Sequence, residues 1–284
     1  MRSSNPVFSR QGAFARDTGP AGFGPSQSAG AQPPQAPYAG NPYDQQLSSE
    51  QLQEMYRAPS AGPLQTGRMT MDDVVARTAM TLLTLVACAA VAWFTIPTGT
   101  YGFAMGAALV AFVVAMVISF RRSVSPALVL IYAGLEGVFL GTMTKVFETY
   151  WPGIAVQAVL GTAAVFAGML IAYRSGRIRV TARYQRIGMA VAVGFLLLLV
   201  VNMVASMFGA DMGLRSGPLG IVVGVLGICL GAFFLSLDFN EIEQGIRAGA
   251  PEREAWRAAF GLTLSLVWIY MEMLRLIAIL RGED

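Results

Sequence analysis

Apolar residues occur in long blocks along the chain after about residue 75, and short breaks rich in Gly, Pro or Arg separate them. A helix needs about 20 apolar residues to cross a hydrocarbon core about 30 Å thick. The blocks have this length, so the pattern predicts an all-α membrane protein, a seven-transmembrane helical bundle. The main alternative is an end segment that lies in the membrane interface. The expected spans are residues 77–96, 101–120, 125–147, 153–173, 187–208, 217–240 and 257–280.

The N-terminal region has a different pattern. It holds nine of the fourteen prolines, together with many Gly, Ser and Gln residues. Such a segment buries too little apolar surface to offset the entropy of ordering. Residues 1–70 are therefore expected to form a disordered cytoplasmic tail, and residues 71–284 the membrane domain. Thr70–Asp73 is typical of a helix start, because Thr can cap the helix and acids suit the positive end of its dipole. The tail lacks the apolar core of a cleavable signal peptide, so it is expected to be retained.

Composition supports a bilayer and excludes several kinds of chemistry. Hydrophobic residues make up 55% of the chain and charged residues 13%, against about 25% charged in soluble domains. The chain has no His, which removes His-dependent zinc, haem and nucleophile-pair sites. Its scattered Arg residues form no nucleic-acid-binding face, and Cys88 and Cys229 lie in apolar blocks. We expect no enzyme activity and no cofactor.

The distribution of Arg residues predicts the orientation. Positively charged loops stay on the cytoplasmic side, and Arg is concentrated in alternate breaks. These breaks put the N-terminus in the cytoplasm and, with seven spans, the C-terminus outside, in a bacterial plasma membrane. The Arg residues concerned are Arg121, Arg122, Arg174, Arg177, Arg179, Arg183, Arg186, Arg247, Arg253 and Arg257.

Three acids lie inside predicted spans: Glu136, Asp238 and Glu272. A charged group at the centre of a membrane helix costs about 2.5–3.5 kcal/mol or more, so such residues are candidates for function. The facing of Glu136 is ambiguous, since it lies about 100° from the Gly137–Gly141 pair. A structural role, as a protonated or paired acid, is the alternative for each.

Helical spacing places Asp238 on a packing face. Small residues recur at steps of four, three and four, and seven more residues lead to Asp238 and then Glu241 on the same face. We therefore expect Asp238 to point into the bundle, with a solvated acid cluster as the alternative. The small residues are Gly220, Gly224, Gly227 and Gly231.

Glu272 lies on a comparable face of the last span. Gly261, Ser265 and Trp268 precede it on that face, and Arg275 follows one turn later. A simple Glu272–Arg275 ion pair is the structural alternative.

Four motifs resemble the Bax-inhibitor-motif family, the Bax inhibitor-1 and YccA-like group of membrane proteins. The resemblance covers about residues 74–284, and its strength lies in the order and spacing of the motifs. They are Leu237–Gln244 (LDFNEIEQ), Trp268–Leu276 (WIYMEMLRL), Gly134–Gly141 (GLEGVFLG) and Ala158–Phe166 (AVLGTAAVF).

The resemblance implies a seven-helix bundle with the last helix near its centre, and a pair of acids that act as a pH-sensitive latch on a calcium leak. These acids correspond to Asp238 and Glu272, with Glu where the family commonly has Asp. The segment between them is about ten residues longer than the family pattern. For a simple hairpin turning near Gly249, the two acids differ in depth by about 18 Å, which excludes direct contact unless residues 246–257 form their own turn or the sixth span bends.

Two functions remain open. The first is a pH-sensitive cation leak, for Ca2+, in which Asp238 and Glu272 form the gate and a transient metal site. Because Ca2+ prefers six to eight oxygens, Glu136, Glu241, carbonyl groups or water would have to contribute, with Arg275 nearby. The second is a membrane interaction protein that modulates a membrane protease or another complex without transport.

Overall fold

The computed structural model describes residues 67–97, 99, 101–209, 213–214 and 216–282. Within these residues the chain forms seven helices, all long and apolar enough to cross a membrane, and no strand beyond a single antiparallel bridge between Arg68 and Pro251. The all-α seven-span prediction is therefore confirmed. Most of the expected 1–70 tail lies outside the described residues. The helices are α3 (Met71–Thr95), α4 (Tyr101–Phe120), α5 (Pro126–Tyr150), α6 (Ile154–Arg174), α7 (Ala182–Met207), α8 (Gly217–Arg247) and α9 (Glu254–Gly282).

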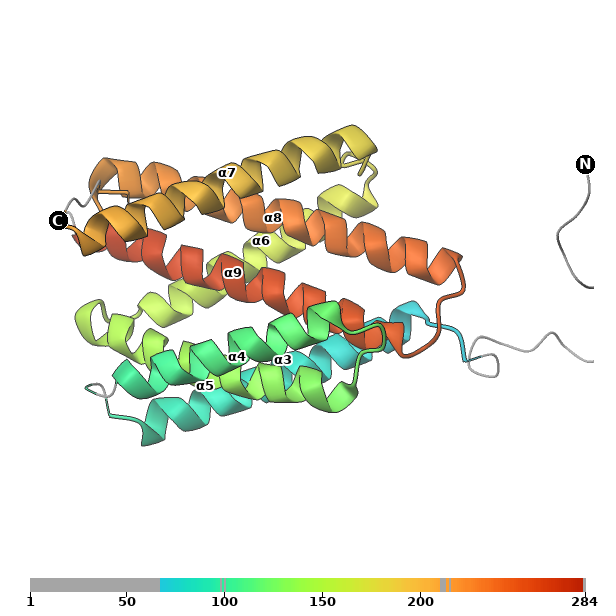
Figure 1. Cartoon of the computed structure of the whole chain (residues 1–284), viewed down its shortest axis with the longest axis horizontal. Helices are drawn as coiled ribbons and strands as arrows, with labels where there is room; N and C mark the ends of the chain where they lie inside the picture. The colour runs from blue at the N-terminus through green and yellow to red at the C-terminus, as the bar shows by residue number, and fades with distance from the viewer. Residues whose placement is uncertain (1–66, 98, 100, 210–212, 215, 283–284) are drawn as a thin grey trace, which may run out of the picture. The chain divides into compact units, whose positions relative to one another are not determined.

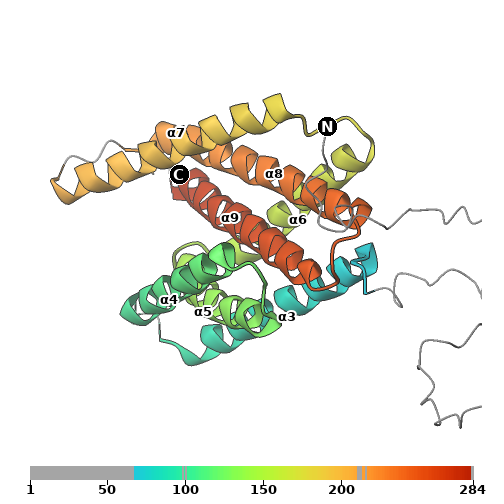
Figure 2. The same cartoon turned by 45° about the vertical axis from the view of Figure 1, so that its right-hand side comes forward.

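The last helix, α9, lies near the centre of the bundle (Figures 1 and 2). It packs against α3, α5, α6 and α8, whereas α4 packs against α5 and α7 packs against α8. Its side chains Ile269 and Leu274 are completely buried. The central position expected for the last helix is confirmed. Because of this position, α9 contributes residues to every candidate site described below.

One end of the bundle carries most of the Arg residues, and we call it the Arg-rich end; it is formed by residues 121–125, 175–181 and 248–253. At this end α3, α7, α8 and α9 extend beyond their predicted spans. The apolar pattern ends before the helices do, because polar residues continue the helices. On α8 an ion pair between Glu243 and Arg247, one turn apart, supports this extension.

The start of α3 is fixed by three kinds of contact. Thr70 and Asp73 form a reciprocal capping box, in which the side chain of each accepts a hydrogen bond from the main-chain N–H of the other. Met69 and Val74 are buried in one cluster, at the positions of a hydrophobic staple. The main chain also pairs with the α8–α9 connection, through bonds from Met69 N to Ala250 O (2.8 Å) and from Glu252 N to Gly67 O (2.9 Å). The predicted helix start is confirmed.

Glycine allows close approach along two helix seams. On α8 a methyl group at Gly231 would overlap Ile269 of α9, so the predicted glycine face is the face that packs on α9. On α5 a methyl group at Gly137 would overlap the carbonyl oxygen of Leu85 in α3, and one at Gly141 would overlap that of Ala89. These two seams hold α8 against α9 and α3 against α5.

Candidate functional site

Asp238 lies at the seam between α8 and α9. Its Oδ2 accepts a hydrogen bond of 2.6 Å from the Ser265 hydroxyl, and its Oδ1 would lie 3.1 Å from a methyl group placed on Gly261. Both partners belong to α9, so Asp238 points into the bundle, as the spacing of the glycines predicted. A charge-assisted bond of this kind is among the stronger hydrogen bonds in proteins.

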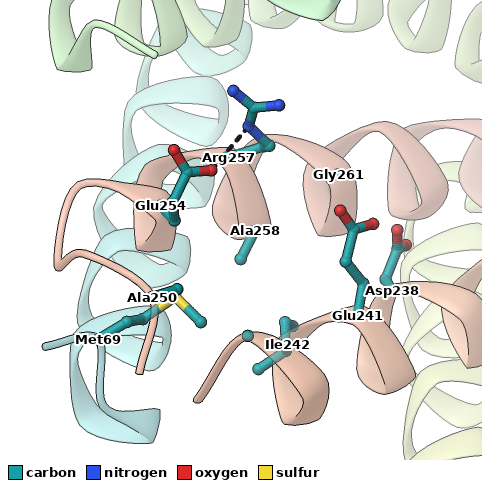
Figure 3. A pocket seen from close by; sticks show the side chains of 10 residues that line it. Met69, Asp238, Glu241, Ile242, Ala250, Glu254, Arg257, Ala258 and Gly261 are labelled. Atoms are coloured by element: carbon teal, nitrogen blue, oxygen red, sulfur yellow. Dashed lines mark ion pairs between the residues drawn. The ribbon is translucent and has the colours of Figure 1, made fainter. Parts of the chain in front are cut away.

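A cavity of about 130 Å³ opens beside Asp238 toward the Arg-rich end. Figure 3 shows Asp238 and Glu241 both projecting into it from α8. From α9, Glu254 and Arg257 form an ion pair of 2.9 Å at its margin. Met69 lines the cavity from the segment before α3. Two carboxylates that form no ion pair with any described residue therefore share one small cavity, and a pre-formed ion pair lies nearby.

Glu272 lies deeper in the bundle and is 7% exposed. Arg275, one turn along α9, forms an ion pair with its Oε2. The same oxygen would lie 2.7 Å from a methyl group on Gly227 of α8. The carbonyl oxygen of Gly227 also accepts a hydrogen bond of 2.9 Å from Trp268 Nε1. Glycine at this position thus leaves room for the acid and exposes a main-chain acceptor to the indole.

A second cavity, of about 570 Å³, contains the Glu272 side chain. Glu136 lines it from α5 and Arg275 from α9, while Ala108 and Phe112 contribute from α4. Glu136 thus faces α9 and the cavity, whereas its neighbour Gly137 faces α3. The ambiguity that the sequence left for Glu136 is resolved by this arrangement.

The structure does not bring Asp238 and Glu272 together. Asp238 lies opposite Gly261 and Ser265, whereas Glu272 lies opposite Gly227. Gly227 and Asp238 are eleven residues apart on α8, which corresponds to about 16 Å along the helix axis. The extra residues between the acids lengthen α8 and α9 and leave only residues 248–253 for the connection, so they do not form a separate turn that would bring the two acids to one depth. One proton or one Ca2+ shared by Asp238 and Glu272 has no basis in this geometry.

The sequence matches the family described as Bax inhibitor 1 like over residues 5–282, nearly the whole chain. The chain belongs to the Bax inhibitor 1 like family. No curated protein matched it. Bax inhibitor 1 like proteins are membrane proteins, and the seven candidate spans place this member in a lipid bilayer.

For this Bax inhibitor 1 like protein, the sequence identified the acids but not all of their neighbours. Spacing placed Ser265 and Trp268 on the Glu272 face without assigning Ser265 to Asp238. Met69 falls within the predicted tail of residues 1–70, but an apolar residue directly before a Thr cap, with Val74 five positions later, fits the pattern of a hydrophobic staple. The register of the α8–α9 hairpin pairs Asp238 with residue 261. This register is the feature of the sequence that indicates different depths for Asp238 and Glu272.

The carboxylates suit weak cation binding more than a resident metal site. Across the described part of the chain, no group of three or more His, Cys, Asp or Glu side chains is arranged to hold a metal ion. Asp238 and Glu241 offer hard oxygen ligands in one cavity, and Glu136 and Glu272 line the other. Ca2+ needs more oxygens than either set supplies, so water or carbonyl groups would complete its coordination.

Proposed function

We propose that this protein is a passive, pH-sensitive cation leak with Ca2+ as the permeant ion. The observation that carries the proposal is the placement of acids at two depths along α9, each beside a cavity. Asp238 and Glu241 line the cavity nearer the Arg-rich end, and Glu136 and Glu272 line the deeper one. Intramembrane acids of this kind commonly mark ion or proton pathways.

The two cavities suggest a relay of two stations, in place of a single latch. In this proposal an ion or proton exchanges between the Asp238 station and the Glu272 station past the α8–α9 seam. The seam between them contains Trp268, whose indole is bonded to Gly227 O and meets Phe195 edge to face at 6.2 Å between ring centroids. Separation of α8 from α9 at this level would connect the stations.

The sign of the pH response follows from charge. A deprotonated carboxylate attracts a cation, whereas a protonated one offers no net charge. Ca2+ flux is therefore expected to fall as the pH is lowered. The Arg-rich end is proposed to face the cytoplasm of a bacterial plasma membrane, because positively charged loops are retained there, and the C-terminus would then lie outside.

Ca2+ flux into liposomes tests the proposal. Purified protein should conduct Ca2+, and both Asp238→Asn and Glu272→Gln should reduce the flux, since each removes the charge of one station. Glu243→Gln is the matched control, because Glu243 lies on α8 but bonds Tyr173 and Arg247 instead of lining either cavity. Equal flux through wild type, Asp238→Asn and empty liposomes would contradict the leak.

The Glu272–Arg275 ion pair favours a second candidate function. An acid neutralised on its own helix suits a structural role in a membrane interaction protein that modulates a membrane protease or another complex. Deleting residues 1–65 separates the two proposals. Unchanged Ca2+ flux after the deletion supports the leak, whereas loss of co-purifying proteins from a chain without flux supports the second candidate.

A further inference from the structure

A third cavity, of about 520 Å³, lies at the Arg-rich end and takes no part in the proposed leak. It is formed by the connection between α4 and α5, the end of the α8–α9 connection with the first turn of α9, and one residue of α3. The side chains that matter here are basic, hydroxyl or aromatic. They are Arg77, Arg121, Arg253, Ser123, Ser125 and Trp256.

The charge in this cavity is positive and only partly compensated. Arg77 is engaged by Glu252, through an ion pair and through the main-chain carbonyl, and its guanidinium lies 5.7 Å from the centroid of the Trp256 ring. Glu252 is the single acid that lines the cavity. Arg121 and Arg253 form no ion pair with any described residue, so two guanidinium groups remain available.

Uncharged donors complete the lining. Ser125 precedes α5 but makes no side-chain capping bond. Its hydroxyl can therefore donate a hydrogen bond to a ligand in the cavity. The positive end of the α5 dipole adds to the attraction for an anion. Arg257 fixes the shape of this wall, because its guanidinium donates to the carbonyl oxygens of Arg121 (3.2 Å) and Arg122 (3.0 Å).

We propose that this cavity binds an anionic phosphate group, carried by a lipid headgroup or by a free phosphate compound. Guanidinium groups bind phosphate oxygens in a bidentate manner, and hydroxyl groups supply further donors. The cavity also lies where a headgroup would be. It is at the end of the spanning helices, beside Trp256, an aromatic type common at membrane interfaces, and near Phe120, which is 81% exposed at the last turn of α4.

Native mass spectrometry of the full chain in detergent tests the site with phosphatidylglycerol and, for comparison, zwitterionic phosphatidylcholine. Wild type should retain phosphatidylglycerol preferentially. The double variant Arg121→Ala/Arg253→Ala should bind it at least about tenfold more weakly, the scale expected for losing charged hydrogen bonds. Replacing the same two residues by Lys keeps the charge but not the guanidinium fork, so an intermediate loss is expected.

The matched control is Arg177→Ala/Arg179→Ala. It removes the same charge from the same end, from exposed residues outside the cavity, and should change phosphatidylglycerol affinity less than about twofold. Competition by inorganic phosphate would identify a free phosphate compound as the ligand, and its absence would identify the lipid headgroup. Equal losses in the two Ala double variants, or equal retention of both lipids by wild type, would overturn the proposal.

Discussion

Ser265 of α9 donates a hydrogen bond of 2.6 Å to Oδ2 of Asp238 on α8. The bond joins the two helices beside the cavity nearer the Arg-rich end, and it gives a hydrogen-bond partner to a hydroxyl at a buried position of α9. It makes Asp238 part of the helix seam as well as part of the cavity. This double role gives the first prediction.

Ser265→Ala should destabilise the protein by about 1–3 kcal/mol, because it leaves a partly buried carboxylate oxygen without its donor. Thermal unfolding in detergent measures the change. Ser119→Ala is the control, since the Ser119 hydroxyl is exposed and bonds only Ala115 O within its own helix. Equal unfolding temperatures for the Ser265→Ala variant and wild type would mean that the bond contributes nothing to the seam.

Breaking the Glu272–Arg275 ion pair should lower the free energy of unfolding substantially. Arg275→Gln removes one partner of this buried ion pair, a change that typically costs about 3–5 kcal/mol. Arg247→Gln removes a partner from the Glu243 pair, where the Arg side chain is 73% exposed, and should cost less than about 1 kcal/mol. Chemical denaturation in mixed micelles compares the two. A smaller loss for the Arg275→Gln variant than for the Arg247→Gln variant would contradict the buried character of the inner pair.

Alanine at two glycines should have opposite effects. Gly231→Ala would place a methyl group against Ile269 and cost about 1–3 kcal/mol through overpacking. Gly194 of α7 has no atom within 4 Å of such a methyl group, so Gly194→Ala should stabilise its helix by up to about 1 kcal/mol. Thermal unfolding of both variants tests the assignment, and stabilisation by Gly231→Ala would argue against a tight α8–α9 seam.

The pH response of Ca2+ flux should depend on Asp238. Wild-type flux should fall as the pH is lowered between about pH 8 and pH 5, a range that covers carboxyl pKa values found at buried sites in proteins. Asp238→Asn carries no charge at either limit, so its flux should be low and its pH response reduced. Glu243→Gln should keep the wild-type profile. An unchanged profile in the Asp238→Asn variant would assign the pH response to other groups.

Hydropathy predicted the seven helices because a bilayer imposes a span length on each of them. The same argument failed at the Arg-rich end of α8 and α9, where polar residues continue the helices and hydropathy gives no signal. Glycine spacing correctly predicted that Asp238 faces α9, since side-chain period is a property of the helix itself. Which α9 residue Asp238 meets depends on the register of the α8–α9 hairpin. The short 248–253 connection fixes a register in which Asp238 does not contact Glu272.

The sequence could not predict the cavities. Glu136 and Glu272 lie on helices that are distant in sequence, and their shared cavity depends on how α4 and α5 pack around α9. The Arg-lined cavity is similar, because Arg77, Arg121 and Arg253 come from three separate segments. The positive-inside pattern included Arg121 and Arg253 but not Arg77, and it gave no sign that the three residues surround one cavity.

The main-chain bonds from the segment before α3 to Ala250 and Glu252 also bear on the order of assembly. During synthesis α3 is the first of the described helices to be made. The segment before it cannot form these bonds until about 180 further residues have been made. The contacts that fix the start of the first described helix therefore become possible only once the α8–α9 connection has been made, late in the chain.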